Sequence, residues 1–90
     1  MTVAEDSVAM NEAGFPLYRS SANGAHRYRI EGWDLFVELQ RIGTRWVVHR
    51  VQATAYPEKL RIRDMVDCAH GAYTPATAAD WAEAWARVTG

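Results

Sequence analysis

Residues 17–40 read LYRSSANGAHRYRIEGWDLFVELQ, and this stretch decides the fold. Asn23-Gly24 is a strong hairpin signal, because a type I′ turn needs positive φ at both of its central residues. Gly32-Trp33 offers a second tight turn, of type II′, with glycine at its first central position. The stretch therefore predicts three antiparallel strands joined by two hairpins.

The two turns also predict how the three strands are paired. The first turn places Leu17 opposite Ile30 and Arg19 opposite Tyr28, and the second places Ile30 opposite Leu35. With these pairings, both hairpins place their apolar side chains on the same face of the sheet. A slip of one residue in either hairpin would break this agreement, because side chains alternate between the faces of a strand.

This pairing predicts one apolar and one mixed face. The apolar face holds Leu17, Tyr28, Ile30, Leu35, Val37 and Leu39. The mixed face holds Tyr18, Arg27, Arg29, Phe36, Glu38 and Gln40. On the mixed face Arg27 lies opposite Glu38, and Arg29 lies between Tyr18 and Phe36 in an arrangement suited to cation–π stacking.

A third hairpin turns at residues 42–44 and leads into a strand over 45–53. Isoleucine is poor at positive φ, so a three-residue loop with Gly43 in the left-handed conformation competes with a two-residue turn. One register places Trp46 and Val48 on the core face. The other register places Val47, His49 and Val51 on the core face, and the sequence pattern does not decide between the two.

Two helices are expected after the strands. Thr77 and Asp80 form a capping-box pattern for a helix over 77–88, which should lay Trp81 and Trp85 on the apolar face of the sheet. Residues 57–70 have proline at a first turn and helical apolar spacing, which favours a helix. A short strand over 59–63 is the alternative, because those residues alternate.

The expected fold class is therefore α+β. An antiparallel β-meander of three or four strands, over about residues 15–54, carries one or two C-terminal helices packed on one face. Residues 15–90 form a single small domain. Residues 1–14 are expected to be a mobile N-terminal lead-in, with a few helical turns around 4–10.

Composition narrows the class of protein. Ninety residues with 49% hydrophobic and 23% charged side chains suit one small globular domain. The single cysteine, Cys68, cannot form an internal disulfide, and no apolar run is long enough to span a bilayer. We therefore expect a cytoplasmic protein with no membrane partner.

Catalytic and metal chemistry have only weak support in the sequence. Asp64, Asp67, Cys68 and His70, with His49, match no strong zinc spacing. Serines 20 and 21 lie near His26, but turn hydroxyls ordinarily bond the local backbone. So small a chain has little room for a pocket that excludes water. We expect no enzyme activity, no catalytic residue, no cofactor and no bound metal.

Charge and aromatic content point instead to binding. Residues 17–63 carry nine bases and four acids, whereas the segments on either side are acidic. Tryptophan, tyrosine and arginine are the residues most enriched at binding hot spots. The candidate partner-binding residues are Tyr18, Arg27, Arg29, Trp33, Phe36, Arg41 and Arg45. The ring of Trp33 could instead fold back over its hairpin and stiffen it.

The sequence thus predicts a small protein-interaction module, such as an adaptor, inhibitor or accessory factor of bacterial or phage type. It would dock a larger protein of unknown identity through the aromatic and arginine sheet face. A second copy of the chain is a further candidate partner, through an edge strand or the uncovered face. The alternative is single-stranded nucleic-acid or RNA binding through the basic, aromatic strands of residues 17–63.

Overall fold

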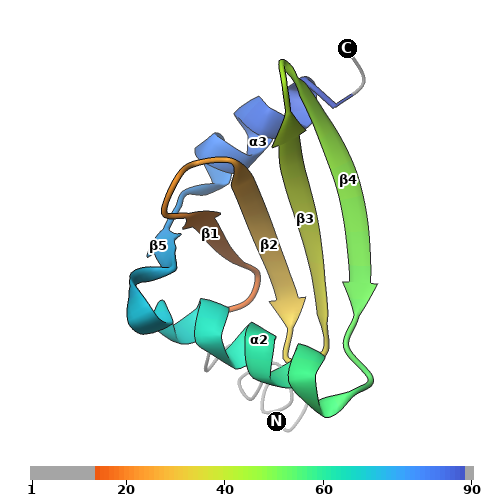
Figure 1. The fold of residues 1–90 in the computed structure, drawn as a ribbon, viewed down its shortest axis with the longest axis vertical. Helices are drawn as coiled ribbons and strands as arrows, with labels where there is room; N and C mark the ends of the chain where they lie inside the picture. Colours follow the sequence, from red (N-terminus) through yellow and green to blue (C-terminus); the bar gives the residue numbers. More distant parts are fainter. Residues whose placement is uncertain (1–13, 89–90) are drawn as a thin grey trace, which may run out of the picture.

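The computed structural model describes residues 14–88 and confirms the α+β class (Figure 1). Five antiparallel strands form one sheet in the order β4-β3-β2-β1-β5. The elements in chain order are β1 (Leu17–Ser21), β2 (His26–Gly32), β3 (Leu35–Ile42), β4 (Arg45–Gln52), α2 (Tyr56–Asp67), the 3₁₀ turn η1 (Ala69–Gly71), β5 (Tyr73–Pro75) and α3 (Ala78–Ala86). The short strand β5, which the sequence did not predict, extends the sheet by pairing with β1. The lead-in predicted for residues 1–14, with its helical turns, lies outside the described residues except for Gly14.

The first hairpin has the predicted register but a different turn. Leu17 lies opposite Ile30, as expected. Gly24 has a φ of 76°, whereas Asn23 is not in the positive-φ region, so the turn is not of type I′. The Gly24 N–H donates to the carbonyl oxygen of Ser21 at 2.9 Å, and the Asn23 side-chain oxygen accepts from the Ala25 N–H at 3.0 Å. The asparagine therefore closes the loop with its side chain.

The second hairpin is shifted by one residue from the predicted register. Ile30 lies opposite Phe36 rather than Leu35, and the pairing is irregular between Ile30 and Gly32. The turn residues are Trp33 and Asp34, and Gly32 does not have positive φ. A turn without positive φ at its central residues does not match the twist of the two strands in a hairpin. A β-bulge beside the turn compensates for this mismatch.

The shift exchanges the side chains of β3 between the two faces of the sheet. Each face now has its own apolar core. One core comprises Tyr28, Ile30, Phe36, Ala53, Ile62 and Met65, and the other comprises Val37, Leu39, Trp46, Trp81 and Ala84. The first includes α2 and the second includes α3, so the helices cover opposite faces, and the prediction that they share one face was wrong. We call these the α2 face and the α3 face; Figure 1 shows the helices near opposite ends of the sheet.

The third hairpin settles the register that the sequence left open. Gly43 and Thr44 form a two-residue turn, and Gly43 has the positive φ of 66° that a type II′ turn needs at its first central position. Trp46 and Val48 consequently face α3, whereas Val51 packs with the core of the α2 face.

Both predicted helices are present. In α3 the Asp80 N–H donates to Thr77 Oγ1 and the Thr77 N–H donates to Asp80 Oδ2, each at 3.0 Å, which is the predicted capping box. Trp81 is buried, but Trp85 stacks on Trp81 and stays 39% exposed, so only one of the two rings enters the core as predicted.

The helix α2 was the favoured prediction for residues 57–70 and is confirmed. Its C-terminal end is tied to β1 by Arg19, which donates to the carbonyl oxygens of Met65 and Val66 at 2.9 and 3.0 Å. The Met65 carbonyl also accepts from the Cys68 N–H at 3.2 Å, so Arg19 adds a second bond there and a further one at Val66, near the end of the helix. Within residues 14–88, no helix has both the length and the apolar character needed to cross a membrane.

Candidate docking surface

Trp33 is the most informative of the candidate residues, because it is a large aromatic side chain that the structure leaves 47% exposed. It lies in the turn between β2 and β3. Its ring meets Phe15 edge to face, with 5.3 Å between ring centroids and an interplanar angle of 88°. The guanidinium carbon of Arg63 lies 5.4 Å from the centre of the indole ring. Trp33 is thus held in place from two sides while part of its ring remains accessible.

The first two turns of α2 extend this exposed area. Tyr56 is 74% exposed and Leu60 is 44% exposed, and both lie on the same face of the helix as Arg63 because they are four and three residues apart. The Glu58 side chain turns back to accept from the N–H groups of Thr54 and Ala55, at 3.2 and 3.4 Å. We define the Trp33 surface as Phe15, Trp33, Tyr56, Lys59, Leu60 and Arg63.

The Trp33 surface is hollowed by two open depressions. One has a volume of about 510 Å³ and is lined by Phe15, Glu31, Gly32, Trp33, Asp34, Leu35 and Lys59. The other has a volume of about 530 Å³ and is lined by Trp33, Tyr56, Lys59, Leu60 and Arg63. Trp33 and Lys59 border both of them. The indole ring therefore stands between two hollows, each large enough for side chains of a partner.

Three other predicted binding residues pack within the molecule instead. The guanidinium carbon of Arg29 lies 5.3 Å from the ring centre of Trp81, and the ring of Tyr18 is 6.3 Å from the same indole. Arg27 lies 5.5 Å from the ring centre of Trp46. The predicted stacking of Arg29 between Tyr18 and Phe36 is wrong, because Phe36 lies on the α2 face and Trp81 of α3 is the aromatic partner of Arg29. These residues are half-buried beneath or beside α3.

Phe36, Arg41 and Arg45 are separated from the Trp33 surface. Phe36 is fully buried in the core of the α2 face, because the register shift moved it away from the mixed face. It cannot contact a partner. Arg41 and Arg45 are exposed at the end of the β3–β4 hairpin. Of the seven predicted residues, only Trp33 belongs to the Trp33 surface.

Residues on α2 were missed, although the sequence contained a signal for them. The apolar spacing that predicts the helix explains its buried side, with Ile62 and Met65 in the core. Tyr56 and Leu60 are large apolar residues that this buried side does not include. An amphipathic helix with such residues on its outer side indicates a second contact surface.

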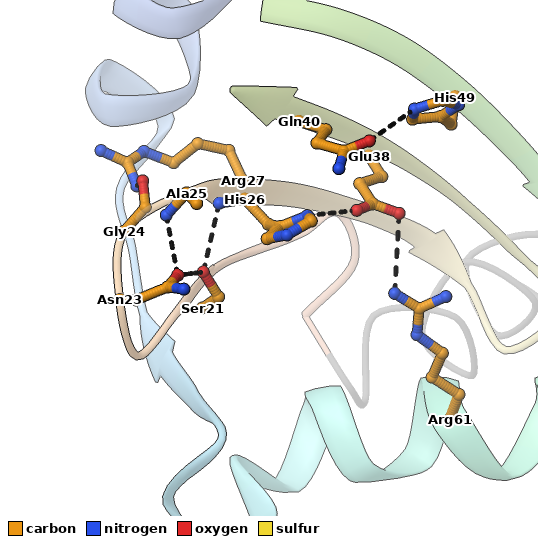
Figure 2. Close-up of polar contacts among 10 residues, drawn as sticks. All are labelled: Ser21, Asn23, Gly24, Ala25, His26, Arg27, Glu38, Gln40, His49 and Arg61. Atoms are coloured by element: carbon orange, nitrogen blue, oxygen red, sulfur yellow. Dashed lines mark hydrogen bonds and ion pairs between the residues drawn. The ribbon is translucent and has the colours of Figure 1, made fainter. Parts of the chain in front are cut away.

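A buried polar cluster lies on the α2 face, around Glu38 (Figure 2). Glu38 is 8% exposed, and its carboxylate binds His26 Nδ1 on one side and Arg61 Nη2, at 3.6 Å, on the other. The predicted pairing of Arg27 with Glu38 is wrong, because the register shift puts them on opposite faces. Burial raises the pKa of the Tyr28 hydroxyl above its ordinary value of 10.0, and the Glu38 carboxylate acts in the same direction.

The hydroxyl groups near His26 have local hydrogen-bond partners. Ser21 Oγ is 2.7 Å from Asn23 Oδ1 and accepts from the His26 backbone N–H at 3.1 Å. Ser20 Oγ accepts from Arg27 Nη1 at 2.8 Å. Their bonds thus support the loop and the sheet, as turn hydroxyls commonly do. Cys68 is a free, half-buried thiol, and residues 14–88 contain no group of three or more side chains placed to hold a metal ion.

Comparisons with protein-family models, with curated proteins and with solved structures find no match to this chain. The chemistry of the Trp33 surface is that of its own side chains. It offers one indole, one phenyl, one phenol and one leucine side chain for apolar contact, together with the cations of Lys59 and Arg63. Glu31 and Asp34 border the first depression, but the second has Lys59 and Arg63 in its lining and no acid, and it suits an apolar group of a partner with an acidic group beside it.

Proposed function

We propose that this chain is a small non-enzymatic interaction module that docks a larger protein through the Trp33 surface. The observation that supports the proposal is the exposed indole of Trp33, held between Phe15 and Arg63 and bordered by two depressions. A held aromatic ring loses little side-chain freedom on binding, so more of its contact free energy contributes to affinity. The module would act as an adaptor, inhibitor or accessory factor.

The shape of the surface supports a protein partner. Tryptophan, tyrosine and arginine dominate binding hot spots, and Trp33, Tyr56 and Arg63 adjoin one another here. Apolar patches of this kind on small proteins commonly mark interaction sites. The lone free thiol, Cys68, favours a reducing and hence cytoplasmic setting for the interaction.

Nucleic-acid binding through residues 17–63 stays the alternative, and one feature favours it. The sequence contains no acidic residue between Glu38 and Glu58, while Arg41, Arg45 and Arg50 are exposed on β3 and β4. Phosphate contacts of this type make affinity fall steeply with salt concentration. The aromatic Trp33 surface, in contrast, would keep its apolar contacts at raised salt.

A capture experiment separates the two functions. The tagged full chain is incubated with a native lysate of its source cells, with and without nuclease, and washed at low and raised salt. We expect a protein partner that survives both treatments, because apolar contacts at Trp33 are insensitive to nuclease and only weakly sensitive to salt. Loss of all captured material under both treatments would favour nucleic acid.

Two variants, each with one tryptophan replaced, test whether the partner binds at the Trp33 surface. Trp33→Ser should abolish capture, whereas Trp85→Ser should retain it, because Trp85 is also partly exposed but belongs to α3. Thermal unfolding of both variants first establishes that each is folded. Equal capture by wild type and Trp33→Ser would remove the Trp33 surface from consideration, and loss only in Trp85→Ser would move the site to α3.

A further inference from the structure

Three arginines from separate elements converge on one depression on the α3 face, away from the Trp33 surface. Arg27 comes from β2, Arg41 from β3 and Arg87 from the end of α3. The depression has a volume of about 360 Å³, and its lining is completed by Gly43, Thr44, Trp46, Glu83 and Ala84. Residues far apart in the sequence thus place three guanidinium groups around one small space.

Arg27 is held rigidly at this depression. Its Nη1 donates to Ser20 Oγ at 2.8 Å and to the carbonyl oxygen of Gly24 at 3.2 Å, and Figure 2 shows the contact with Gly24. Its guanidinium carbon also lies 5.5 Å from the ring centre of Trp46. Its Nε is buried and has no hydrogen-bond partner within the described chain. The guanidinium is therefore fixed in position by bonds from Nη1, while its Nη2 forms no hydrogen bond with residues 14–88 and is the donor left for a ligand.

The charges around the depression are not balanced. Glu83 is the one carboxylate among its lining residues, against three arginines. Glu83 Oε2 lies 3.9 Å from Arg87 Nη2, and both side chains are more than 60% exposed, so this pair is weak. Arg41 forms no ion pair with any residue in 14–88. Asp80 of α3 also interacts electrostatically with Arg27, so three arginines stand against two nearby carboxylates, and an excess of positive charge remains in a space bounded by the indole of Trp46.

We propose that this depression is a binding site for a single oxyanion, a carboxylate or phosphate group of a small ligand. Arginine suits such a group, because its planar fork can donate two parallel hydrogen bonds to two oxygens. The fixed Arg27 would orient the group, while the exposed Arg41 and Arg87 would close on it from the rim. The site lies apart from the Trp33 surface and does not depend on the function proposed for that surface.

The test is an NMR titration of the full chain with two probes, inorganic phosphate and acetate, each at constant ionic strength adjusted with chloride. The arginine Nε–Hε signals and the indole N–H signals are followed in ¹⁵N spectra. We expect saturable shifts for Arg27 and Trp46 at millimolar probe. Saturation by phosphate alone assigns a phosphate site, and saturation by acetate at equal or lower concentration assigns a carboxylate site.

Two matched double variants make the result specific. Arg41→Gln with Arg87→Gln removes two charges from the rim and should weaken binding about tenfold or more, since charge-assisted hydrogen bonds are lost. Arg45→Gln with Arg50→Gln removes the same net charge from exposed positions of β4 outside the depression and should retain the wild-type affinity. Shifts that never saturate with either probe, or equal weakening in both double variants, would overturn the proposal.

Discussion

The two faces of the sheet are built on different principles. On the α2 face, Ile30, Phe36, Ile62 and Met65 are completely buried, and the helix above them has twelve residues. On the α3 face, a nine-residue helix contributes Trp81 to a core shared with Trp46 of β4, and Arg27 and Arg29 stack on these rings. Both faces have arginines that stack on aromatic rings, but Arg61 on the α2 face is also paired with the buried Glu38, whereas Arg27 and Arg29 on the α3 face have no buried acid beside them within residues 14–88.

The charged residues are also arranged differently on the two faces. The α2 face encloses one acid, Glu38, between His26 and Arg61. The α3 face carries arginines that stack on indole rings without a facing carboxylate from β3. The charges of the α2 face thus centre on a buried carboxylate, whereas the α3 face has no buried carboxylate among the described residues. Three substitutions test this difference, and a fourth tests the capping box at the start of α3.

Phe36→Ala should have the largest effect, because it removes a fully buried ring from the core of the α2 face. We expect a loss of about 3–5 kcal/mol in the free energy of unfolding, from lost transfer free energy and from the cavity left behind. Urea unfolding followed by tryptophan fluorescence measures it. Ile62→Val, a milder change in the same core, should lower the free energy of unfolding by about 0.5–1.5 kcal/mol. It can be measured even if Phe36→Ala does not fold. Losses near zero in both variants would contradict the described burial.

Glu38→Gln should have the next largest effect. It keeps the shape of the side chain but removes the charge that binds His26 and Arg61, which should cost about 1–3 kcal/mol. Glu83→Gln is the matched control, because its pair with Arg87 is exposed and should change stability by less than about 0.5 kcal/mol. Equal effects of the two substitutions would show that Glu38 does not act as a buried charge.

Arg29→Gln tests the α3 face and should have a smaller effect. Its guanidinium stacks on Trp81 and its Nε donates to Glu31 at 2.6 Å. Loss of the cation–π contact should cost about 0.5–1 kcal/mol in urea unfolding. Arg50→Gln, at an exposed position of β4, serves as the control and should be nearly neutral. A loss as large as that in Phe36→Ala would erase the difference between the two faces.

The sequence predicted the elements of this fold better than their pairing. The capping box of Thr77 and Asp80, and Pro57 at the start of α2, are local signals, and both helices are where those signals place them. The first hairpin kept its register although its turn type was wrong. In the second, the irregularity between Ile30 and Gly32 moved every β3 side chain to the other face. A bulge depends on local strain and tertiary packing, which alternation alone does not reveal.

The same register shift explains why part of the candidate site could not be predicted from the sequence. Trp33 was identified because its position at a turn tip gave it no place in the core. Phe36 was assigned to the wrong face, and β3 appeared to have a single apolar face when both of its faces are covered. Apolar spacing over residues 57–70 indicates only the buried side of the helix, and Tyr56 and Leu60 lie outside that spacing. The contact between Phe15 and Trp33 joins segments that no periodicity relates.

Asp80→Asn should have the smallest effect, and its signature is a dependence on pH. The backbone N–H and the side chain of Thr77 hold the pKa of the Asp80 carboxyl below its ordinary value of 3.8. Because the pKa is lowered in the folded state, the stabilisation is present above pH 3.8 and disappears as the pH falls through the folded value. The melting temperature of wild type should therefore exceed that of the variant at neutral pH, and the gap should narrow in acid. A gap that stays constant from neutral to acidic pH would mean that the capping bond of α3 does not depend on the charge of Asp80.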